Sequence, residues 1–325
     1  MRIVLADAGR ATTVEHALRG LGMWTRRHSA HGHGGDHVAF AVTPTSTPVP
    51  ATAVRGVDGV VAVYDADSLH PLVDAMPRTC TLRGRVLGVG EAPALFAGPC
   101  SVESEEQIHR VAAAVARHGA VALRGGAWKP RTSPRGFQGH GTPALGWLVD
   151  AARAHGLAVV TEVVAERDVD AVAAVVDVLQ VGARTMHSGA LLRAVGAAHR
   201  PVLLKRAFAA TLEEWLLAGE ALLLHGAPVV LFCERGVRGP DNGMRNVLDV
   251  GAVAVLAHAH GLPVVVDPSH AAGRRDVVVP LAMAGLAAGA CGVVIEVHDR
   301  PAEALSDAPQ ALDPEALAPL GLRRQ

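Results

Sequence analysis

A group of cationic side chains without acidic partners is the first feature of this sequence that could do chemistry. The segment LRGGAWKPRTSPRGFQG, residues 123–139, holds three arginines and Lys129 among glycines and prolines. No Asp or Glu occurs between residues 107 and 149, although the whole chain carries a formal net charge of −1. Because arginine and lysine are the side chains that bind phosphate and carboxylate groups, this segment predicts a binding site for an anion.

Lysine is used very sparingly in this chain. Lys129 and Lys205 are the only lysines among 30 lysine and arginine residues. An ammonium group can donate a proton to a substrate, whereas a guanidinium group stays charged in proteins. The preference for arginine in the rest of the chain therefore suggests a chemical role for both lysines. Chance is the other explanation, because lysine is mostly a surface residue.

The composition limits the class of protein. The chain has 325 residues, of which 50% are hydrophobic and 19% charged, so it can bury a large core in one large domain with a small appendage. A nearly neutral charge argues against a nucleic-acid-binding surface, and we find no apolar stretch of 18 residues that would span a membrane. The four cysteines lie far apart without a CxxC pair, which is typical of a reduced, cytoplasmic protein.

Two domains are expected from the order of apolar segments. Residues 1–75 read as strand, helix, two strands, a weaker helix and a strand, which predicts a small ferredoxin-like α+β domain. Residues 76–92 are expected to be a linker. From residue 93 to residue 325, eight apolar runs, from ALFAGPC to CGVVIEV, alternate with segments of helical length. This pattern predicts an α/β (β/α)8 TIM barrel. An open doubly wound sheet is the alternative, although no GxGxxG turn opens a helix.

Polar residues follow the apolar runs, and in a barrel these positions meet at one end. Four of the eight strand ends carry arginine or lysine, which predicts a ligand with phosphate and carboxylate groups. A thiol, an imidazole and two carboxylates in the same region would suit a divalent metal such as Mn²⁺, Fe²⁺, Co²⁺ or Zn²⁺, with Cys100, His270, Glu296 and Asp307 as the candidates. A buried structural role for Cys100 remains the other interpretation.

Several motifs together resemble the 3-deoxy-D-arabino-heptulosonate 7-phosphate (DAHP) synthases. GPCSVES, RGGAWKPRTSPRGFQG, VVTEV, LQVGAR, PVLLKR, CERG, RNVLD, VVDPSHAAGRRD, IEVH and ALSDAPQAL occur in the order and spacing of that family. The chain is similar to the type I subclass with an N-terminal ferredoxin-like domain. The resemblance is strong over residues 92–312 and covers residues 1–75 only in layout.

The resemblance implies a transferase that condenses phosphoenolpyruvate with erythrose 4-phosphate and water, the first step of the shikimate pathway to chorismate and the aromatic amino acids. It implies that the metal is held by Cys100, His270, Glu296 and Asp307, and that Lys129, Glu162 and His270 take part in catalysis. Phosphoenolpyruvate would be bound by Arg124, Lys129, Gly182, Ala183, Arg184, Lys205 and Arg235, with Asp267 beside them. The phosphate of the aldose would be bound by Arg131, Thr132 and Ser133.

Departures from the family pattern keep other functions open. Ala207 stands where the family usually has Gly, and Ala272 where it usually has Thr. The same chemistry on another aldose, as in the related 3-deoxy-octulosonate phosphate synthases or in a secondary pathway, is one alternative. A non-catalytic regulatory barrel is another. The family also suggests a homotetramer or homodimer, with an aromatic amino acid as a possible effector of the N-terminal domain.

We expect Arg131→Ala to raise the KM for the aldose phosphate about tenfold or more, because a guanidinium fork binds phosphate through two hydrogen bonds. The KM for phosphoenolpyruvate should change much less. Steady-state kinetics with each substrate varied in turn would measure both constants. Equal increases in the two KM values would contradict a specific contact with the aldose phosphate.

Overall fold

The computed structural model of the chain describes residues 1–325 apart from residues 33–34, 65–68, 130–134, 241 and 323–325. The chain divides into two compact units, Met1–Pro71 and Leu72–Gln325. The sequence had suggested a boundary at residue 75 and a linker over 76–92. The second unit instead begins earlier, because Val73 and Met76 are buried in its hydrophobic core.

In its described residues, the first unit is a four-stranded antiparallel sheet with two α-helices. Its elements are β1 (Arg2–Leu5), α1 (Ala11–Gly20), β2 (Thr25–Gly32), β3 (Gly35–Val42), α2 (Ala51–Arg55) and β4 (Val60–Tyr64). The strands are arranged in the order β2-β3-β1-β4. Val14 and Leu18 of α1 and Val54 of α2 share one core with Ile3 and Phe40 of the sheet. This unit therefore has a hydrophobic core of its own.

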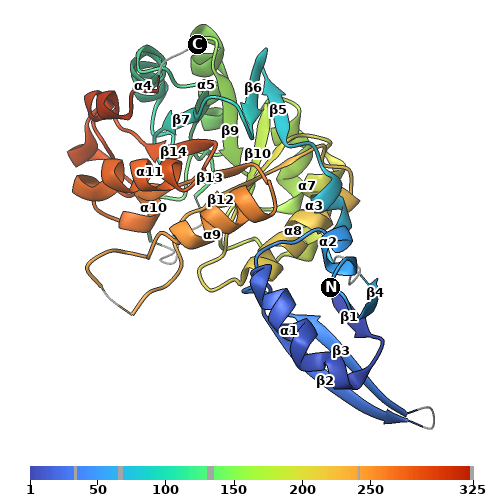
Figure 1. Cartoon of the computed structure of the whole chain (residues 1–325). Coiled ribbons are helices and arrows are strands. Elements are labelled where there is room, and N and C mark those ends of the chain that lie inside the picture. Colours follow the sequence, from blue (N-terminus) through green and yellow to red (C-terminus); the bar gives the residue numbers. More distant parts are fainter. Residues whose placement is uncertain (33–34, 65–68, 130–134, 241, 323–325) are drawn as a thin grey trace. The chain divides into compact units, whose positions relative to one another are not determined.

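The second unit is built on a closed barrel of eight parallel strands, so the sheet is not open and doubly wound (Figure 1). The strands are β7 (Ala94–Gly98), β8 (Ala122–Arg124), β9 (Ala158–Glu162), β10 (Val178–Val181), β11 (Val202–Lys205), β12 (Val230–Glu234), β13 (Val264–Val266) and β14 (Gly292–Glu296). Each of the eight apolar runs forms one of them. The last strand pairs with the first, with Glu296 opposite Gly98, and this pair closes the TIM barrel.

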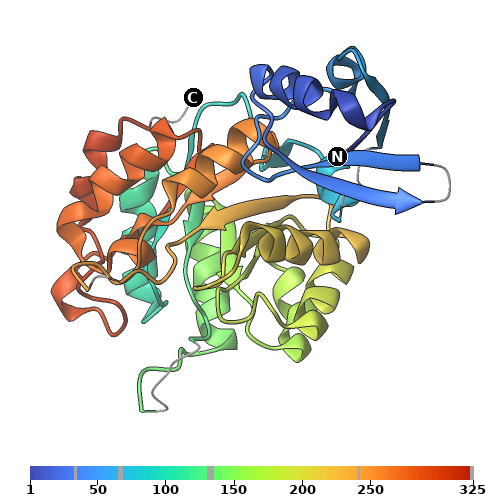
Figure 2. The same ribbon diagram turned by 60° about the horizontal axis from the view of Figure 1, so that its bottom comes forward.

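Helices surround the strands, as the green to red ribbons of Figure 2 show. They are α4 (Glu105–Arg117), α5 (Thr142–Ala154), α6 (Val169–Ala173), α7 (Gly189–Ala197), α8 (Leu212–Leu224), α9 (Val250–Ala254), α10 (Pro268–Ala272) and α11 (Val278–Ala287). After β14 the chain forms a 3₁₀ helix over Pro314–Leu320 rather than an α-helix, because Pro319 inside it cannot donate a backbone hydrogen bond. Among the described residues, no helix is long and apolar enough to cross a membrane.

A hairpin covers the N-terminal end of the barrel. After α3 (Pro71–Ala75), β5 (Thr79–Leu82) pairs with β6 (Arg85–Gly88). Leu82 and Leu87 of this hairpin are each 4% exposed and belong to the core inside the barrel, with residues such as Phe96 and Leu231. A second, larger core lies between the strands and the helices. The hairpin therefore closes the N-terminal end of the barrel.

We expect a truncated chain that starts at Leu72 to unfold cooperatively with the stability of the intact barrel. A chain that starts at Ala92 lacks the hairpin, and its free energy of unfolding should be lower by about 3 kcal/mol or more. The reason is that two buried leucine side chains are lost from the core. Urea denaturation followed by circular dichroism would measure both free energies of unfolding.

Point variants of the full chain provide the control for this comparison. Leu87→Ala should cost about 2–5 kcal/mol, whereas Val86→Ala, at a position that is 47% exposed, should change stability by about 0.5 kcal/mol or less. Equal stability of the two truncated chains would contradict a structural role for the hairpin.

Candidate active site and metal cluster

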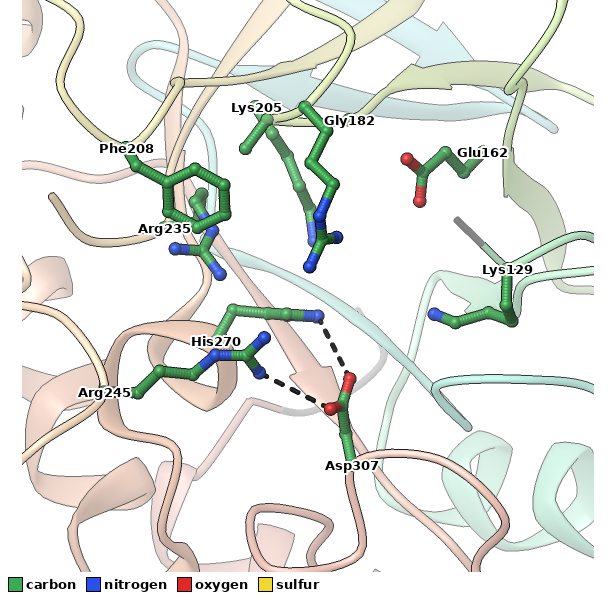
Figure 3. A pocket seen from close by; sticks show the side chains of 11 residues that line it. Lys129, Glu162, Gly182, Lys205, Phe208, Arg235, Arg245, His270 and Asp307 are labelled. Atoms are coloured by element: carbon green, nitrogen blue, oxygen red, sulfur yellow. Dashed lines mark hydrogen bonds and ion pairs between the residues drawn. The ribbon is translucent and has the colours of Figure 1, made fainter. Parts of the chain in front are cut away.

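The carboxyl ends of the barrel strands bring polar side chains from distant parts of the sequence to one mouth. Arg124, Glu162, Lys205 and Glu296 are the last residues of β8, β9, β11 and β14. Figure 3 shows a cavity at this mouth, into which cations and carboxylates project from several strands. The cavity is lined by Lys129, Glu162, Gly182, Ala183, Arg184, Lys205, Phe208, Arg235, Arg245, His270 and Asp307.

Four potential metal ligands lie together at one side of this cavity. One donor atom from each of Cys100, His270, Glu296 and Asp307 lies within 4.8 Å of all the others. His270 Nε2 is 3.3 Å from Glu296 Oε1 and 3.9 Å from Asp307 Oδ2. The Cys100 thiol donates a hydrogen bond of 2.9 Å to Asp307 Oδ2. Closure of the barrel explains the meeting, because Cys100 follows β7 and Glu296 ends its neighbour β14.

His270 is held in the orientation that a metal ligand needs. Its Nδ1 lies 2.8 Å from Asp267 Oδ2, and its backbone N–H donates to Asp267 Oδ1 at 3.0 Å, where α10 begins. Burial lowers the pKa of the His270 imidazole despite the nearby carboxylates, which favours the neutral ring. A neutral ring that donates from Nδ1 to a carboxylate leaves the lone pair of Nε2 for a metal ion.

The donor chemistry of the cluster fits a divalent cation. Burial, followed by the charge of Glu296, raises the pKa of the Cys100 thiol to about 12, so a nearby cation is needed to form the thiolate. Burial alone would raise the pKa of the Glu296 carboxyl, but His270 and Arg124 outweigh it and lower this pKa. One sulfur, one nitrogen and two carboxylates form a set that borderline divalent metals prefer.

Two loops that carry ligands are locked to each other. Ser101 and Ser306, which adjoin Cys100 and Asp307 in the sequence, are buried and share a hydrogen bond of 2.5 Å. Glu103 accepts a hydrogen bond of 2.8 Å from the backbone N–H of Leu305 in the same pair of loops. These contacts fix the position of Asp307 even though its backbone has a φ of 50°, in the sparsely populated left-handed region.

The cations differ in how far their charge is already balanced. Arg206 bonds to Glu234 and Asp249 at 3.0 Å each, so it serves a buried ion-pair network. Arg124 bonds to Glu296 at 3.1 Å, while its buried Nε has no partner among the described residues. Among the described residues, Lys129 donates a hydrogen bond to a neutral carbonyl oxygen, that of Cys100, at 3.1 Å. Burial lowers the pKa of Lys129, but the Cys100 sulfur and Glu296 outweigh it, and the net shift is upward.

Glycines make room where the backbone approaches the site closely. A Cβ atom on Gly98, whose φ is 154°, would lie 2.0 Å from the carbonyl oxygen of Arg124. A Cβ atom on Gly182 would lie 1.9 Å from Glu162 Oε1. The absence of side chains at these two positions therefore leaves space for Arg124 at the end of β8 and for the carboxylate of Glu162.

The structure brings most of the residues predicted from the sequence to this mouth. Nine of them line the cavity: Lys129, Glu162, Gly182, Ala183, Arg184, Lys205, Arg235, His270 and Asp307. Asp267 is completely buried and bonds to Lys205 and His270, so its position suits support of these residues rather than contact with a substrate. Arg131, Thr132 and Ser133 lie outside the described residues.

Sequence reasoning missed two residues of the cavity, Phe208 and Arg245. Arg245 bonds to Asp307 at 3.4 Å (Figure 3) and also to Gln310 at 3.3 Å. Its motif, RNVLD, was among those that carried the family resemblance, but the motif gave Arg245 no role. Phe208 had no such signal, because a single aromatic residue after a strand is usually part of the core.

Comparison with known proteins gives a consistent result. The sequence model described as the DAHP synthetase I family matches residues 75–322. A phospho-2-dehydro-3-deoxyheptonate aldolase of Thermotoga maritima is 46% identical over 219 residues, which are 67% of this chain and 65% of that protein. The chain therefore matches slightly less than two thirds of the length of this relative. A 2-dehydro-3-deoxyphosphooctonate aldolase of Acidithiobacillus ferrooxidans is 36% identical over 67% of this chain and 83% of that protein.

Two solved structures from Thermotoga maritima are also similar. The crystal structure of its phospho-2-dehydro-3-deoxyheptonate aldolase (DAHP synthase) has a TM-score of 0.76 and 36% identity, and the match covers 98% of this chain and 94% of that one. A truncated form of its 3-deoxy-D-arabino-heptulosonate 7-phosphate synthase has a TM-score of 0.69 and 38% identity, over 77% and 96% of the two chains.

We expect Cys100→Ser to lose metal affinity by about tenfold or more while the protein stays folded, because a serine hydroxyl is a poor replacement for a thiolate ligand. Metal content after dialysis against a weak chelator, measured by mass spectrometry, would report the loss. Cys291→Ser is the matched control, since this buried thiol lies outside the cluster and donates to the Val264 carbonyl. Unchanged metal binding in Cys100→Ser would contradict the assignment of Cys100 as a ligand and indicate a purely structural role.

Proposed function

The chain belongs to the DAHP synthetase I family, and we propose that it condenses phosphoenolpyruvate with erythrose 4-phosphate and water to give 3-deoxy-D-arabino-heptulosonate 7-phosphate and phosphate. The observation that carries this proposal is a single cavity with two chemically distinct sides. A cluster of potential metal ligands borders one side, and Arg184, Lys205 and Arg235 border the other. Such a cavity suits one substrate with a carbonyl oxygen that a metal ion can polarise and another with two anionic groups.

Phosphoenolpyruvate is held in this proposal by the cationic side of the cavity. Its phosphate and carboxylate need several strong donors, and Arg184, Lys205, Arg235 and Lys129 supply them from the ends of four different strands. Arg124 lies directly behind, fixed by Glu296 and by the carbonyl oxygen of Pro99. Fixing the enol phosphate from several directions points its C3 carbon at the second substrate.

The metal cluster provides the place for the aldehyde. A divalent cation bound by Cys100, His270, Glu296 and Asp307 would supply Lewis acidity at the aldehyde oxygen. Family membership agrees with metal dependence, while the kind of metal stays a prediction from the donor set. Asp267 keeps the His270 ring oriented, and Lys205 balances the charge of Asp267.

The bond changes follow from these positions. C3 of phosphoenolpyruvate forms a carbon–carbon bond with the aldehyde carbon, and the resulting alkoxide takes a proton from the Lys129 ammonium. Water adds to C2, and Glu162 accepts its proton. The C2–O bond to phosphate then breaks, the phosphate leaves with the electron pair, and C2 becomes a ketone as its hydroxyl gives its proton to the departing phosphate. Lys129 is the better proton donor of the cavity's cations, because a guanidinium does not release its proton.

A different aldose is the second candidate for the substrate. This candidate is supported by the similarity of the chain to 2-dehydro-3-deoxyphosphooctonate aldolases, such as two that are 36% and 32% identical. The heptonate aldolase of Thermotoga maritima is more similar, at 46% identity. Both reactions consume phosphoenolpyruvate and release phosphate. They differ in the length of the aldose, for which Arg131, Thr132 and Ser133 remain the proposed phosphate ligands.

We further propose a ferredoxin-like arrangement for residues 1–71, supported by the order β1-α1-β2-β3-α2-β4 along the chain and β2-β3-β1-β4 across the sheet. This unit would respond to an aromatic amino acid, the end product of the pathway, within a homotetramer or homodimer. The cytoplasmic location expected from the sequence also stays a prediction.

The decisive experiment measures phosphate release from phosphoenolpyruvate with either erythrose 4-phosphate or arabinose 5-phosphate, before and after treatment with a chelator. We expect release with erythrose 4-phosphate, loss after chelation, and recovery when Mn²⁺ is added back. Faster release with arabinose 5-phosphate would favour the octulosonate reaction. No release with either aldose at full metal content would contradict an enzymatic function.

Lys129→Arg should lower kcat about 100-fold or more, because it keeps the positive charge but removes the proton donor. The apparent affinity for phosphoenolpyruvate should change far less than kcat. Arg193→Lys, on the exposed side of α7, is the matched control and should behave as the unaltered enzyme. A normal kcat for Lys129→Arg would assign the proton transfer to another group.

A further inference from the structure

Phe208 has an unusual position for an aromatic residue in this cavity. It lies in the loop after β11, three residues beyond Lys205, is only partly buried, and forms part of the cavity wall. The other described lining residues with long side chains are ionisable. Figure 3 shows the ring next to Arg235, at the cationic side of the cavity. The ring therefore meets the groups that would bind an anion.

Three guanidinium groups gather around this one ring. The Cζ atom of Arg235 is 4.6 Å from the ring centroid, and those of Arg184 and Arg238 are each 5.8 Å away. These arginines come from two different loops, after β10 and after β12. Three like charges in one place repel each other, and the electron-rich face of an aromatic ring offsets part of that repulsion.

Contact with a ring leaves the hydrogen-bond donors of an arginine available. Among the described residues, the Arg235 guanidinium donates a hydrogen bond to the carbonyl oxygen of Gly236, from Nη1 at 3.2 Å. Arg235 is 2% exposed, so a carboxylate partner in place of the ring would neutralise it before a substrate arrives. A ring instead orients the guanidinium plane without neutralising its positive charge.

The loop that carries the ring is fixed by backbone contacts rather than by the guanidinium groups around the ring. The carbonyl oxygen of Phe208 accepts a hydrogen bond of 2.8 Å from the backbone N–H of Arg238. The next turn is held by Arg206, whose Nε donates to the carbonyl oxygen of Ala210 at 2.9 Å. The loop is thus anchored to a buried ion-pair network outside the cavity, and the ring can serve as a fixed support.

We propose that Phe208 is a positioning residue for the anionic substrate: its ring holds Arg235 and Arg184 in the orientation that binds phosphoenolpyruvate. The proposal rests on the proposed function for the identity of the anion. Phe208 takes no part in proton transfer or in bond formation. Its effect is therefore confined to the affinity for phosphoenolpyruvate and spares the site of the aldose.

The test compares Phe208→Leu, which keeps an apolar side chain without a π face, with Phe208→Tyr, which keeps the ring. Titration calorimetry of the metal-loaded protein with phosphoenolpyruvate alone should show about five- to tenfold weaker binding for Phe208→Leu, as expected for the loss of a cation–π contact. Phe208→Tyr should stay within about twofold of the unaltered protein. Thermal unfolding of each variant verifies that the fold is kept.

Kinetics separates positioning from a general structural role. In Phe208→Leu the KM for phosphoenolpyruvate should rise while the KM for the aldose phosphate and kcat change by less than about twofold. A parallel fall in kcat and rise in both KM values would overturn the proposal, because it would indicate general damage to the barrel mouth. Equal phosphoenolpyruvate affinity of Phe208→Leu and the unaltered protein would overturn it as well.

A double variant asks whether Phe208 acts through Arg235. If it does, adding Phe208→Leu to Arg235→Lys should weaken phosphoenolpyruvate binding by less than it does in the unaltered background. Fully additive losses would assign the effect to a different contact.

Failure of the proposed function gives a different result. Unaltered protein that binds phosphoenolpyruvate but condenses it with neither aldose would contradict the proposed reaction, while the binding comparison of the Phe208 variants would still hold. Unaltered protein that does not bind phosphoenolpyruvate would overturn both proposals.

Discussion

The carboxylate of Asp267 is the interaction on which both sides of the site depend. It is completely buried, and its pKa is lowered well below the usual range, because His270 and Lys205 outweigh the effect of burial. One oxygen contacts both the His270 ring and the Lys205 ammonium. Removal of either partner would leave an incompletely compensated buried charge, a loss that costs about 3–5 kcal/mol in proteins. The metal cluster and the anion-binding side are thus joined by one charge.

Segregation of charge around the mouth has a simple structural origin. The loops after β8, β10 and β12 contribute cations to the cavity, whereas β14 and the loop after it contribute Glu296 and Asp307. The acid-free stretch of the sequence provides no carboxylate of its own next to Lys129. Elsewhere at the mouth, Arg206 is neutralised by Glu234 and Asp249 and supports the loop of Phe208. The net result is a cavity in which cations remain available on one side only, which is what an anion with two charged groups requires.

Much of the fold was predictable from the sequence, because buried parallel strands leave continuous apolar runs. All eight runs became barrel strands. The hairpin of β5 and β6 was not predicted and was taken for a linker. Its turn places Arg83 and Gly84 at φ values of 48° and 80°, and Arg-Gly is a far weaker signal for such a turn than Asn-Gly. The last helix was also not predictable in detail, since two prolines in Pro314–Leu320 favour a 3₁₀ helix there.

In the site, too, contacts between residues that are distant in the sequence were harder to predict than local features. Cys100 and Asp307 are separated by 207 positions, so spacing alone could not bring them together; their donor chemistry made them candidate ligands, and the resemblance to a family assigned them the metal. The register of the closing pair, with Glu296 opposite Gly98, makes that proximity a consequence of barrel closure. Phe208 and its contact with the arginines escaped prediction for a related reason. Their contact arises because β10, β11 and β12 are consecutive neighbours in the barrel, with Val181 opposite Leu204 and Lys205 opposite Cys233. This register carries the three following loops to the same side of the mouth, where the ring of the middle loop meets guanidinium groups from both of its neighbours.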